Sequence, residues 1–405
     1  MNANESQRWA PPKYTTRKRL ILPAIVFIIF FSLNISGALN KSWHHWLYIF
    51  VFAWALSNLL TPLAIRFSFI LGWLDIPHGR KAHEHPTPTL GGAAIIGSFG
   101  IALLTNFHFS FAMKGIGLAS LLIWIVGVLD DRFELPAIIK LLAQILATVI
   151  LIVFGVQVTF MPNVWWGYLA EYIITAFWII GITNAVNYLD GLDGLAAGMS
   201  SIICIFLAIV AIQTGQSYFG LVALALLGAC LGFLPYNIHY KKSADVFLGD
   251  NGATFLGFAL AATATMGDWA EDNLAAIIVP ILLFGVPIFD MTLTTITRIA
   301  TGKVKSFGQW LAYTGRDHFH HRLAALGVGN YIAVIVIYVV TFFLGISAIV
   351  LKQARGVDAV LLLVQSGIFF LLIIFFMLYV QPRQIRVEIK SVTDDSLQDL
   401  EKSEE

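Results

Sequence analysis

The sequence predicts an all-α, polytopic integral membrane protein with about 11-12 transmembrane helices. Hydrophobic residues make up 58% of the 405 residues, charged residues make up 12%, and the mean hydropathy is +0.80. A soluble domain carries roughly twice that share of charged residues, so the composition excludes a soluble enzyme, a disordered chain and a nucleic-acid binder. The two cysteines, Cys204 and Cys230, lie within apolar runs and predict neither a disulfide framework nor a zinc site.

Apolar runs of roughly 20 residues, the length that crosses a bilayer, place the helices along the chain. The predicted spans are 20–39, 45–72, 90–105, 114–129, 137–156, 164–183, 196–214, 217–235, 253–267, 273–295, 329–350 and 358–380. The third and fourth are short, and the second is long enough to tilt. The first follows basic residues and could be a cleaved signal peptide, but its length favours a retained helix.

Lysine and arginine are unevenly divided between the two alternating sets of loops. Of the 25 Lys and Arg residues, 20 lie in the set that includes both termini and 4 lie in the other set. The positive-inside rule makes the first set cytoplasmic. The chain then divides into a cytoplasmic N-terminal segment (1–19), a transmembrane domain (20–380) and a polar cytoplasmic tail (381–405).

The polar motifs gather in the cytoplasmic loops and at the cytoplasmic ends of helices, which predicts an active site on the cytoplasmic face. A secondary transporter, the main alternative from another class, would place its ionisable groups near the bilayer midplane. The observed pattern favours chemistry at the inner interface, between a water-soluble reactant and one dissolved in the bilayer.

Two adjacent carboxylates, Asp130 and Asp131, close the fourth predicted helix. Paired carboxylates at a membrane boundary are costly to desolvate, and each raises the pKa of the other. A divalent cation or a nearby base would relieve that cost. The alternative interpretation is a solvated helix end, and the pair alone does not decide between the two.

Four polar residues spaced three apart, Asn184, Asn187, Asp190 and Asp193, follow the sixth predicted helix. If that helix continues so far, all four share one stripe of its surface. Two carboxylates and two amides on one stripe suit a nucleotide or a hydrated metal. A polar helix terminus with glycine caps is the alternative.

Asp250 precedes the ninth predicted helix, and Asp290 lies near the cytoplasmic end of the tenth. Asp250 could cap its helix or hold magnesium, which is usually bound by one or two carboxylates together with waters and substrate phosphates. An intramembrane aspartate such as Asp290 is a functional candidate by default, with Arg298 or a bound ligand as its partner.

Three histidines and an arginine, His318, His320, His321 and Arg322, lie close together in the largest cytoplasmic loop. No cysteine and no His-Glu-x-x-His spacing accompanies them, so the patch suits phosphate or sugar oxygens better than zinc. In the loop before the third helix, Lys81 and His83 are further candidate phosphate contacts, although the positive-inside rule alone explains that loop equally well.

In this order, the motifs resemble those of the polyprenyl-phosphate N-acetylhexosamine-1-phosphate transferase family, over residues from about 46 to 380. The resemblance rests on Lys-x-His with Pro-Thr-Leu-Gly-Gly, the Asp130-Asp131 pair followed by Lys140, and Asn-x-x-Asn-x-x-Asp-Gly-x-Asp-Gly. It continues with Phe-Leu-Gly-Asp-Asn-Gly, Pro-Ile-Phe-Asp and the histidine motif.

The resemblance implies transfer of a sugar-1-phosphate from a UDP-N-acetylsugar to undecaprenyl phosphate, with release of UMP. It also implies a bacterial plasma (inner) membrane location, a start for cell-envelope polysaccharides such as O-antigen, and dependence on Mg2+, for which Mn2+ could substitute. A homodimer is compatible with the apolar surface. Besides the transporter, an integral-membrane phosphatase is a rival, and it would release phosphate instead of UMP.

The resemblance also assigns roles. The implied catalytic residues are Asp130, Asp131, Asp193 and Lys140. The implied metal ligands are Asp250 and Asp131. The implied substrate-binding residues are Lys81, His83, Asn184, Asn187, Asp190, Arg298, His318, His320, His321 and Arg322.

The histidine motif separates two branches of the family. The branch that uses UDP-N-acetylmuramoyl-pentapeptide tends to carry three consecutive histidines, whereas Phe319 interrupts them here, so UDP-GlcNAc is the preferred donor. UDP-GalNAc or another UDP-N-acetylhexosamine remains the alternative. Asn251 departs from the family pattern, which has a small or apolar residue at that position, and could alter the choice of sugar.

Overall fold

The structure is a computed structural model, and helices make up nearly all of it. It describes residues 17–35, 42–77, 86–105, 110–240, 242–267, 269, 273–313, 315, 317–353 and 357–379. Lys81 and His83 lie outside these residues. Most of the predicted N-terminal segment and all of the predicted tail also lie outside them.

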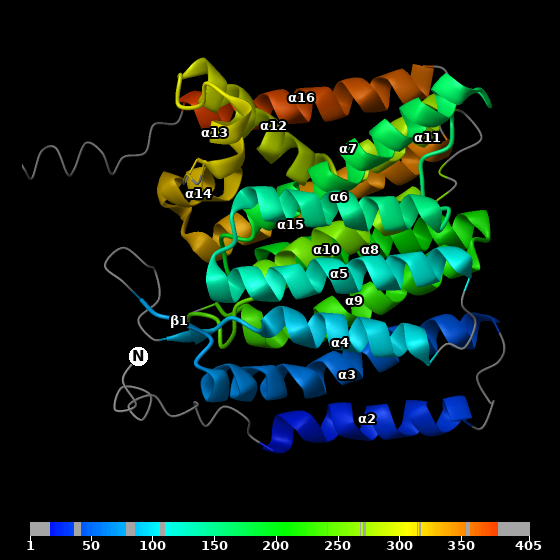
Figure 1. The fold of residues 1–405 in the computed structure, drawn as a ribbon, viewed down its shortest axis with the longest axis vertical. Helices are drawn as coiled ribbons and strands as arrows, with labels where there is room; N and C mark the ends of the chain where they lie inside the picture. Colours follow the sequence, from blue (N-terminus) through cyan, green and yellow to red (C-terminus); the bar gives the residue numbers. More distant parts are fainter. Residues whose placement is uncertain are drawn as a thin grey trace, which may run out of the picture.

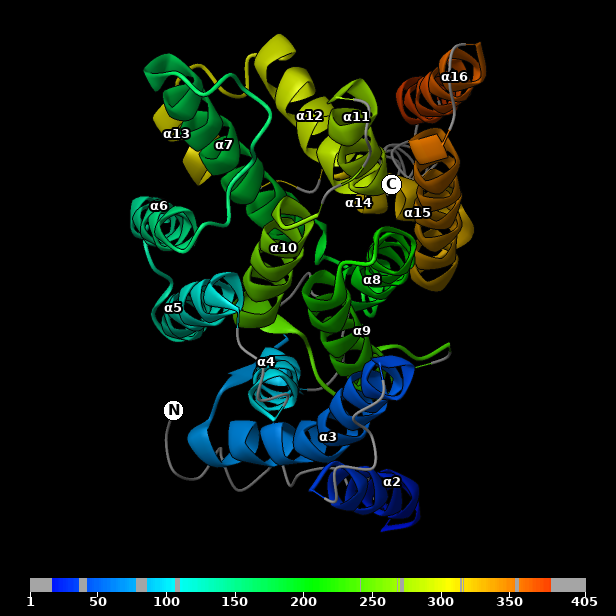
Figure 2. The same cartoon turned by 90° about the vertical axis from the view of Figure 1, so that its right-hand side faces the viewer.

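Most of the helices lie side by side and run roughly the same way, although several are tilted, and most loops lie at the two ends of the bundle (Figures 1 and 2). Their bounds are α2 (Arg17–Ile35), α3 (Ser42–Leu71), α4 (Gly91–Leu104), α5 (Phe111–Phe133), α6 (Ala137–Val153), α7 (Trp165–Leu189), α8 (Leu195–Thr214), α9 (Ser217–Asn237), α10 (Gly249–Thr265), α11 (Asn273–Leu283), α12 (Gly285–Ala300), α13 (Phe307–Ala312), α14 (Phe319–Leu323), the π-helix η1 (Ala324–Val328), α15 (Asn330–Gln353) and α16 (Val357–Tyr379).

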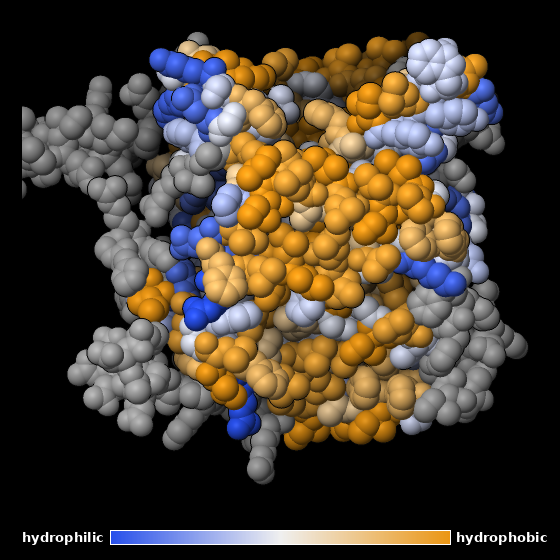
Figure 3. Space-filling view, viewed as in Figure 1, coloured by the Kyte–Doolittle hydropathy of each residue, from blue (hydrophilic) through white to orange (hydrophobic). Residues whose placement is uncertain are grey.

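Each of the twelve predicted spans has a helix at its position. Among the described residues, seven helices are long and apolar enough to cross a membrane, and α11 with α12 makes an eighth span if the two halves count as one. Apolar side chains cover the middle of the bundle, and hydrophilic residues gather toward its ends (Figure 3). The prediction of an all-α, polytopic membrane protein is confirmed. The exact number of spans stays a prediction, because α4, α6 and α10 are shorter than a full crossing.

The tenth predicted span, 273–295, is wrong as a single straight helix. The chain breaks at Phe284 between α11 and α12, and the two halves are bent by 80°. Prolines explain the break: Pro287 has no N–H to donate to the preceding turn, and Pro280 lies inside α11. The bend leads α12 away from the direction of α11 and carries Asp290 and Arg298 along the new axis.

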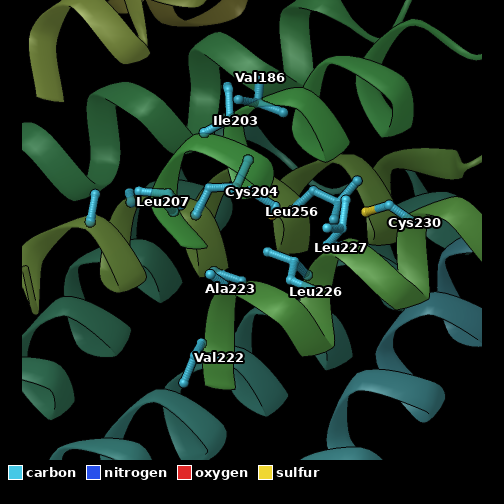
Figure 4. Packing of buried hydrophobic residues seen from close by; sticks show 14 of the residues in the cluster. Val186, Ile203, Cys204, Leu207, Val222, Ala223, Leu226, Leu227, Cys230 and Leu256 are labelled. Atoms are coloured by element: carbon cyan, nitrogen blue, oxygen red, sulfur yellow. The ribbon is translucent and has the colours of Figure 1, made fainter. Parts of the chain in front are cut away.

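The centre of the bundle is formed by α8, α9 and α10, which are buried along most of their length. Figure 4 shows their apolar side chains packed together, with Cys204 on α8 and Cys230 on α9 among them. Both thiols are free and buried, in agreement with the prediction of no disulfide framework. A rigid core of this kind fixes the ends of α7 and α10, where the polar motifs lie.

A short antiparallel ribbon lies at the end of the bundle that also carries α13 and α14 (Figure 1). Its strands are β1 (Leu74–Asp75) and β2 (Thr87–Pro88). The N–H of Phe247 donates to the carbonyl of Pro88 at 2.8 Å, and the N–H of Gly91 donates to the carbonyl of Phe247 at 3.1 Å. These bonds tie the segment before α10 to the ribbon. They fix the start of α10, and Asp250 lies in the first turn of that helix.

Gly127 allows α5 and α10 to pack closely beside the paired aspartates. A Cβ at Gly127 would lie 2.6 Å from the Cα of Asn251, whereas a Cβ at Gly117 on the same helix would meet nothing within 4 Å. Gly127→Ala is therefore expected to push α10 away from α5 at a cost of about 1–3 kcal/mol.

The measurement is the thermal midpoint and the turnover of each variant in detergent. Gly127→Ala should lower both, and the matched variant Gly117→Ala should leave turnover unchanged and stability equal or slightly higher. Equal behaviour of the two variants would contradict the packing interpretation.

Candidate active site

Asp130 and Lys140 form an ion pair where α5 turns into α6. Lys140 Nζ lies 2.8 Å from Asp130 Oδ2, and the N–H of Leu135 donates to Asp130 Oδ1 at 2.9 Å. Asp130 is 6% exposed, whereas Lys140 is half-buried. The turn that joins the two helices is tight enough to need a left-handed residue, Glu134 with φ of 50°. The pair places a carboxylate and an ammonium group side by side at this end of the bundle.

Asp131 points to α10 and caps its first turn. Its Oδ1 accepts from the N–H of Asp250 at 2.9 Å, and its Oδ2 accepts from Asn251 Nδ2 at 2.5 Å. Both carboxylate oxygens are thus engaged by N–H donors at a helix N-terminus, where a negative charge is favourable. Asp131 thereby positions Asp250, and Asn251, the residue that departs from the family pattern, is part of this contact.

The polar stripe is only half helical. Helix α7 continues through Leu189, so Asn184 and Asn187 lie on its surface, but Asp190 ends the helix and Asp193 lies in the following loop. The shared stripe was predicted on the condition that the helix continues through all four residues, and this condition is not met for the two aspartates. Gly191 follows Asp190 and Gly194 follows Asp193. Gly194 is the N-cap of α8 and adopts a φ of 80°, a left-handed conformation that glycine allows.

Asn184 is engaged by a residue that the motif analysis missed. Gln144 Nε2 donates to Asn184 Oδ1 at 3.2 Å, and Asn184 Nδ2 donates to Gln144 Oε1 at 2.8 Å and to the carbonyl of Ile180. The amide pair links α7 to α6 and so fixes Lys140, one turn before Gln144. A polar residue four positions after Lys140 in an apolar helix was the signal that could have identified Gln144.

Four carboxylates, those of Asp131, Asp190, Asp193 and Asp250, lie close enough to interact electrostatically. Asn187 Nδ2 donates to Asp250 Oδ1 at 3.1 Å, and Asp193 Oδ2 accepts from the N–H of Ala244 at 2.8 Å. Burial, followed by the charges of Asp250, Asp193 and Asp131, raises the pKa of Asp190 well above its usual value. Several carboxylates so close together repel one another, and a bound cation would relieve that repulsion.

The oxygen donors at this cluster fit a magnesium site in which the protein supplies only one or two of the ligands. Among the described residues, no group of three or more His, Cys, Asp or Glu side chains has the geometry of a closed metal site. Oxygen donors are nonetheless what Mg2+ prefers, and it usually takes one or two carboxylates and completes its shell with water and phosphate. Asp250 and Asp190 suit that role better than Asp131, whose oxygens are occupied by the cap.

The histidine motif forms a second cluster with α12. Arg298 donates to Asp317 through Nε at 2.9 Å and through one terminal nitrogen, Nη2, at 2.6 Å. Burial opposes the charged form of Asp317, but the hydrogen bonds and charge of Arg298 outweigh it and lower the pKa of that carboxyl. Arg322 Nε also donates to the carbonyl of Asp317 at 2.8 Å. Asp317 was missed as a site residue, although it precedes the histidines directly.

Asp290 pairs with His318, and not with Arg298, which was one of the two partners that the sequence left open. Its Oδ2 lies 2.7 Å from His318 Nδ1, and its Oδ1 accepts from the N–H of Phe319. The reason is the bend at Phe284 and the path of the loop, which bring His318 over Asp290 and leave Arg298 to Asp317. No local pattern in the sequence encodes either pairing.

The two clusters meet around Tyr188 and Gly191. The Tyr188 ring lies 5.5 Å from the His318 ring, and Tyr188 interacts electrostatically with Lys140 and Arg298. A Cβ at Gly191 would lie 2.1 Å from His320 Nε2, so only glycine fits there. His321 packs on His320 with ring centroids 4.1 Å apart. The described site residues therefore form one continuous site.

His320 is expected to make folding sensitive to acid. Burial, followed by the charges of His321 and His318, lowers the pKa of His320 to about 2. Below pH ~6.5 the unfolded chain binds a proton that the folded chain refuses, so stability falls by about 1.4 kcal/mol per pH unit. His320→Gln should remove that loss.

The measurement is the difference in thermal midpoint between pH 7.5 and pH 5.5. Between these two pH values the thermal midpoint of the wild type should fall by more than that of His320→Gln. His45→Gln, which changes a histidine in the first turn of α3, is the control and should behave as the wild type. The same loss in His320→Gln and in the wild type would show that His320 is accessible and titrates normally.

Comparisons with known proteins agree with the order of these motifs. Residues 113–268 match the model of glycosyl transferase family 4. A Bacillus subtilis protein described as a probable undecaprenyl-phosphate N-acetylglucosaminyl 1-phosphate transferase is 36% identical over 324 residues, which cover 78% of this chain and 86% of that protein.

Two further relatives carry descriptions that differ from that of the B. subtilis protein. A decaprenyl-phosphate N-acetylglucosaminephosphotransferase of Mycolicibacterium smegmatis is 32% identical over 68% of this chain and 73% of its own length. A phospho-N-acetylmuramoyl-pentapeptide-transferase of Chlamydia trachomatis is 31% identical over 62% of this chain and 78% of its own length.

Proposed function

Since the chain belongs to glycosyl transferase family 4, we propose that it transfers GlcNAc-1-phosphate from UDP-GlcNAc to undecaprenyl phosphate and releases UMP. The observation that carries the proposal is the Asp130–Lys140 pair beside Asp250, at one end of an apolar bundle. A lipid phosphate in the bilayer interface and a diphosphate in solution can both reach that position. The product, a sugar linked to the lipid by a diphosphate, would initiate a cell-envelope polysaccharide.

The choice of UDP-GlcNAc rests on two independent points. The B. subtilis and M. smegmatis relatives are both described as N-acetylglucosaminyl-type transferases, and they are more similar to this chain than the C. trachomatis muramoyl relative is. The histidine motif is interrupted by Phe319, which is buried in the hydrophobic core. Three adjacent histidine side chains are therefore not available for a peptide-bearing sugar.

The membrane orientation is part of the same proposal. We propose that the site and both termini lie on the cytoplasmic side of the bacterial inner membrane, and the excess of lysine and arginine in one set of loops supports this orientation. UDP-sugars are cytosolic, so this orientation brings donor and lipid phosphate to the same face. Helix α2 packs on α3 through Phe27 and Phe52, with ring centroids 5.1 Å apart, which supports its retention. A homodimer stays a prediction.

Asp130 would act as the proton acceptor. The Lys140 ammonium lies 2.8 Å from the Asp130 carboxylate, and the second proton of a phosphate monoester has a pKa near neutrality. Asp130 would take that proton, and the lipid phosphate oxygen would attack the β-phosphorus of the donor. The new P–O bond forms as the bond to the α-phosphate oxygen breaks, and UMP leaves with that oxygen.

Magnesium bound at Asp250, with Asp190 nearby, would neutralise the diphosphate. The chain itself would supply the remaining positive charge through Lys140 and the Arg298 cluster, because phosphoryl transfer depends on positioning and charge neutralisation. A covalent route, in which an aspartate attacks first, is the alternative. Exchange of labelled UMP into UDP-GlcNAc without lipid would favour the covalent route, and its absence the direct one.

The test uses purified protein in detergent with magnesium and undecaprenyl phosphate. UDP-GlcNAc, UDP-GalNAc and UDP-MurNAc-pentapeptide are offered separately, and UMP is measured. UMP release that needs both lipid and UDP-GlcNAc is the expected result. Release with another donor alone would overturn the sugar assignment, and release of inorganic phosphate without UMP would overturn the transferase.

A further inference from the structure

Four side chains on two segments form one hydrogen-bonded chain, and three of them, Asp290, Arg298 and His318, are buried. Asp290 and Arg298 lie about two turns apart on α12. His318 lies between them, with Nδ1 at 2.7 Å from Asp290 Oδ2 and Nε2 at 3.2 Å from Arg298 Nη2. Asp317 accepts from Nε of Arg298 and from Nη2, the nitrogen that also contacts His318. Asp290 is 1% exposed, so water does not compete for these contacts.

The partners determine the proton on the histidine. Arginine can only donate, so His318 Nε2 must carry a lone pair toward Arg298. The Asp290 carboxylate can only accept, so His318 Nδ1 must carry the proton. Both contacts are satisfied by the neutral Nδ1–H tautomer alone. An imidazolium or the Nε2–H tautomer would place two N–H donors against each other.

Arg298 is 4% exposed, and not all of its nitrogens are engaged by these contacts. Its Nε and Nη2 are engaged by Asp317 and His318, and the guanidinium stacks over Tyr313 at 4.5 Å from the ring centroid. Nη1 has no hydrogen-bond partner among the described residues and keeps two N–H groups for an anion. Asp317, His318 and Tyr313 together hold the guanidinium in one orientation.

We infer that Asp290 is a positioning residue: it fixes the tautomer of His318, and His318 with Asp317 fixes Arg298 for the phosphate or sugar of the donor. This inference rests on the proposed function and deepens it. It reassigns His318 from a direct substrate contact to a holder of Arg298. Asp290 also anchors α14 through the N–H of Phe319, so the histidine motif and Arg298 share one support.

Asp290→Asn is the sharpest variant, because it keeps the shape of the side chain. The amide has one acceptor oxygen for two donors, so its NH2 group faces His318 Nδ1 and forces the proton to Nε2. Arg298 then loses one contact. We expect the KM for UDP-GlcNAc to rise about tenfold to a hundredfold, the range for a lost hydrogen bond to a charged group, with the KM for the lipid unchanged.

The first readout does not depend on activity. In protein labelled with 15N-histidine, NMR distinguishes the Nδ1–H and Nε2–H tautomers, and the His318 signal is the one missing in His318→Gln. The wild type should show Nδ1–H and Asp290→Asn should show Nε2–H. An imidazolium or an Nε2–H tautomer in the wild type would overturn the inference, whether or not the chain accepts UDP-GlcNAc.

The second readout separates positioning from simple destabilisation. The amide oxygen of His318→Gln can accept from Arg298 without help from Asp290, whereas the shorter His318→Asn cannot reach it. Asp290→Asn should therefore raise the donor KM less than twofold in the His318→Gln background. Glu171→Gln, a buried carboxyl near the other end of α7 that accepts from the N–H of Met161, is the matched control and should leave the donor KM unchanged. Equal effects of Asp290→Asn in both backgrounds would contradict the relay through His318.

Discussion

Asp130→Asn is expected to lower UMP release by roughly 10²- to 10⁴-fold, the range for loss of a positioned general base. The amide keeps the shape of the carboxylate, so the turn into α6 and the contact with the N–H of Leu135 should survive. The change removes the group that accepts the lipid proton, and it leaves Lys140 without its counter-charge. Both the direct and the covalent routes require a carboxylate at this position or beside it.

The measurement is the initial rate of UMP release at saturating donor and lipid, together with the thermal midpoint. Glu134→Gln is the matched control, because Glu134 is an exposed carboxylate four residues later in the same turn. The control should keep wild-type turnover. A rate for Asp130→Asn within tenfold of the wild type would remove Asp130 from the chemistry.

Asp250→Asn is expected to abolish magnesium-dependent turnover, with a loss of about three orders of magnitude. Asp250 is where Asn187, Asp190 and the Asp130–Lys140 pair converge, and one of its oxygens is free of the contact with Asn187. A neutral amide binds a hard cation poorly, and the donor diphosphate would then remain uncompensated. Higher magnesium should restore only part of the rate.

Two measurements test this variant: UMP release over a magnesium titration, and the thermal midpoint with and without magnesium. The wild type should be stabilised by magnesium and Asp250→Asn should not. Asp358→Asn, in the first turn of α16, removes a carboxylate remote from the site motifs in sequence and should match the wild type. An unchanged magnesium requirement in Asp250→Asn would place the cation elsewhere.

Most of the helical framework could be predicted from hydropathy, because a bilayer-length apolar run leaves the backbone few alternatives to a helix. The predicted span 217–235 and the helix α9 (Ser217–Asn237) differ by two residues at one end. The bend at Phe284 could not be predicted in size, although Pro280 and Pro287 signal a break. The angle depends on how α12 packs against other helices, which no local pattern contains.

The members of the site were more predictable than their contacts. Acidic, amide and histidine residues stand out in an apolar chain, so Asp130, Asn187 and His320 could be identified from type and spacing. Their partners come from distant segments: Asp131 caps a helix that begins more than a hundred residues later. Gln144 and Asp317 were missed because each looks unremarkable until the fold brings Asn184 or Arg298 beside it.

The most direct test of the central claim follows the β-phosphate of the donor. Purified protein, magnesium and undecaprenyl phosphate are incubated with UDP-GlcNAc labelled with 32P at the β-phosphate, and the lipid and aqueous products are separated. Transfer of GlcNAc-1-phosphate predicts that the label enters the lipid fraction while unlabelled UMP is released. Label that remains in the aqueous phase as UDP, with GlcNAc alone on the lipid, would contradict the account.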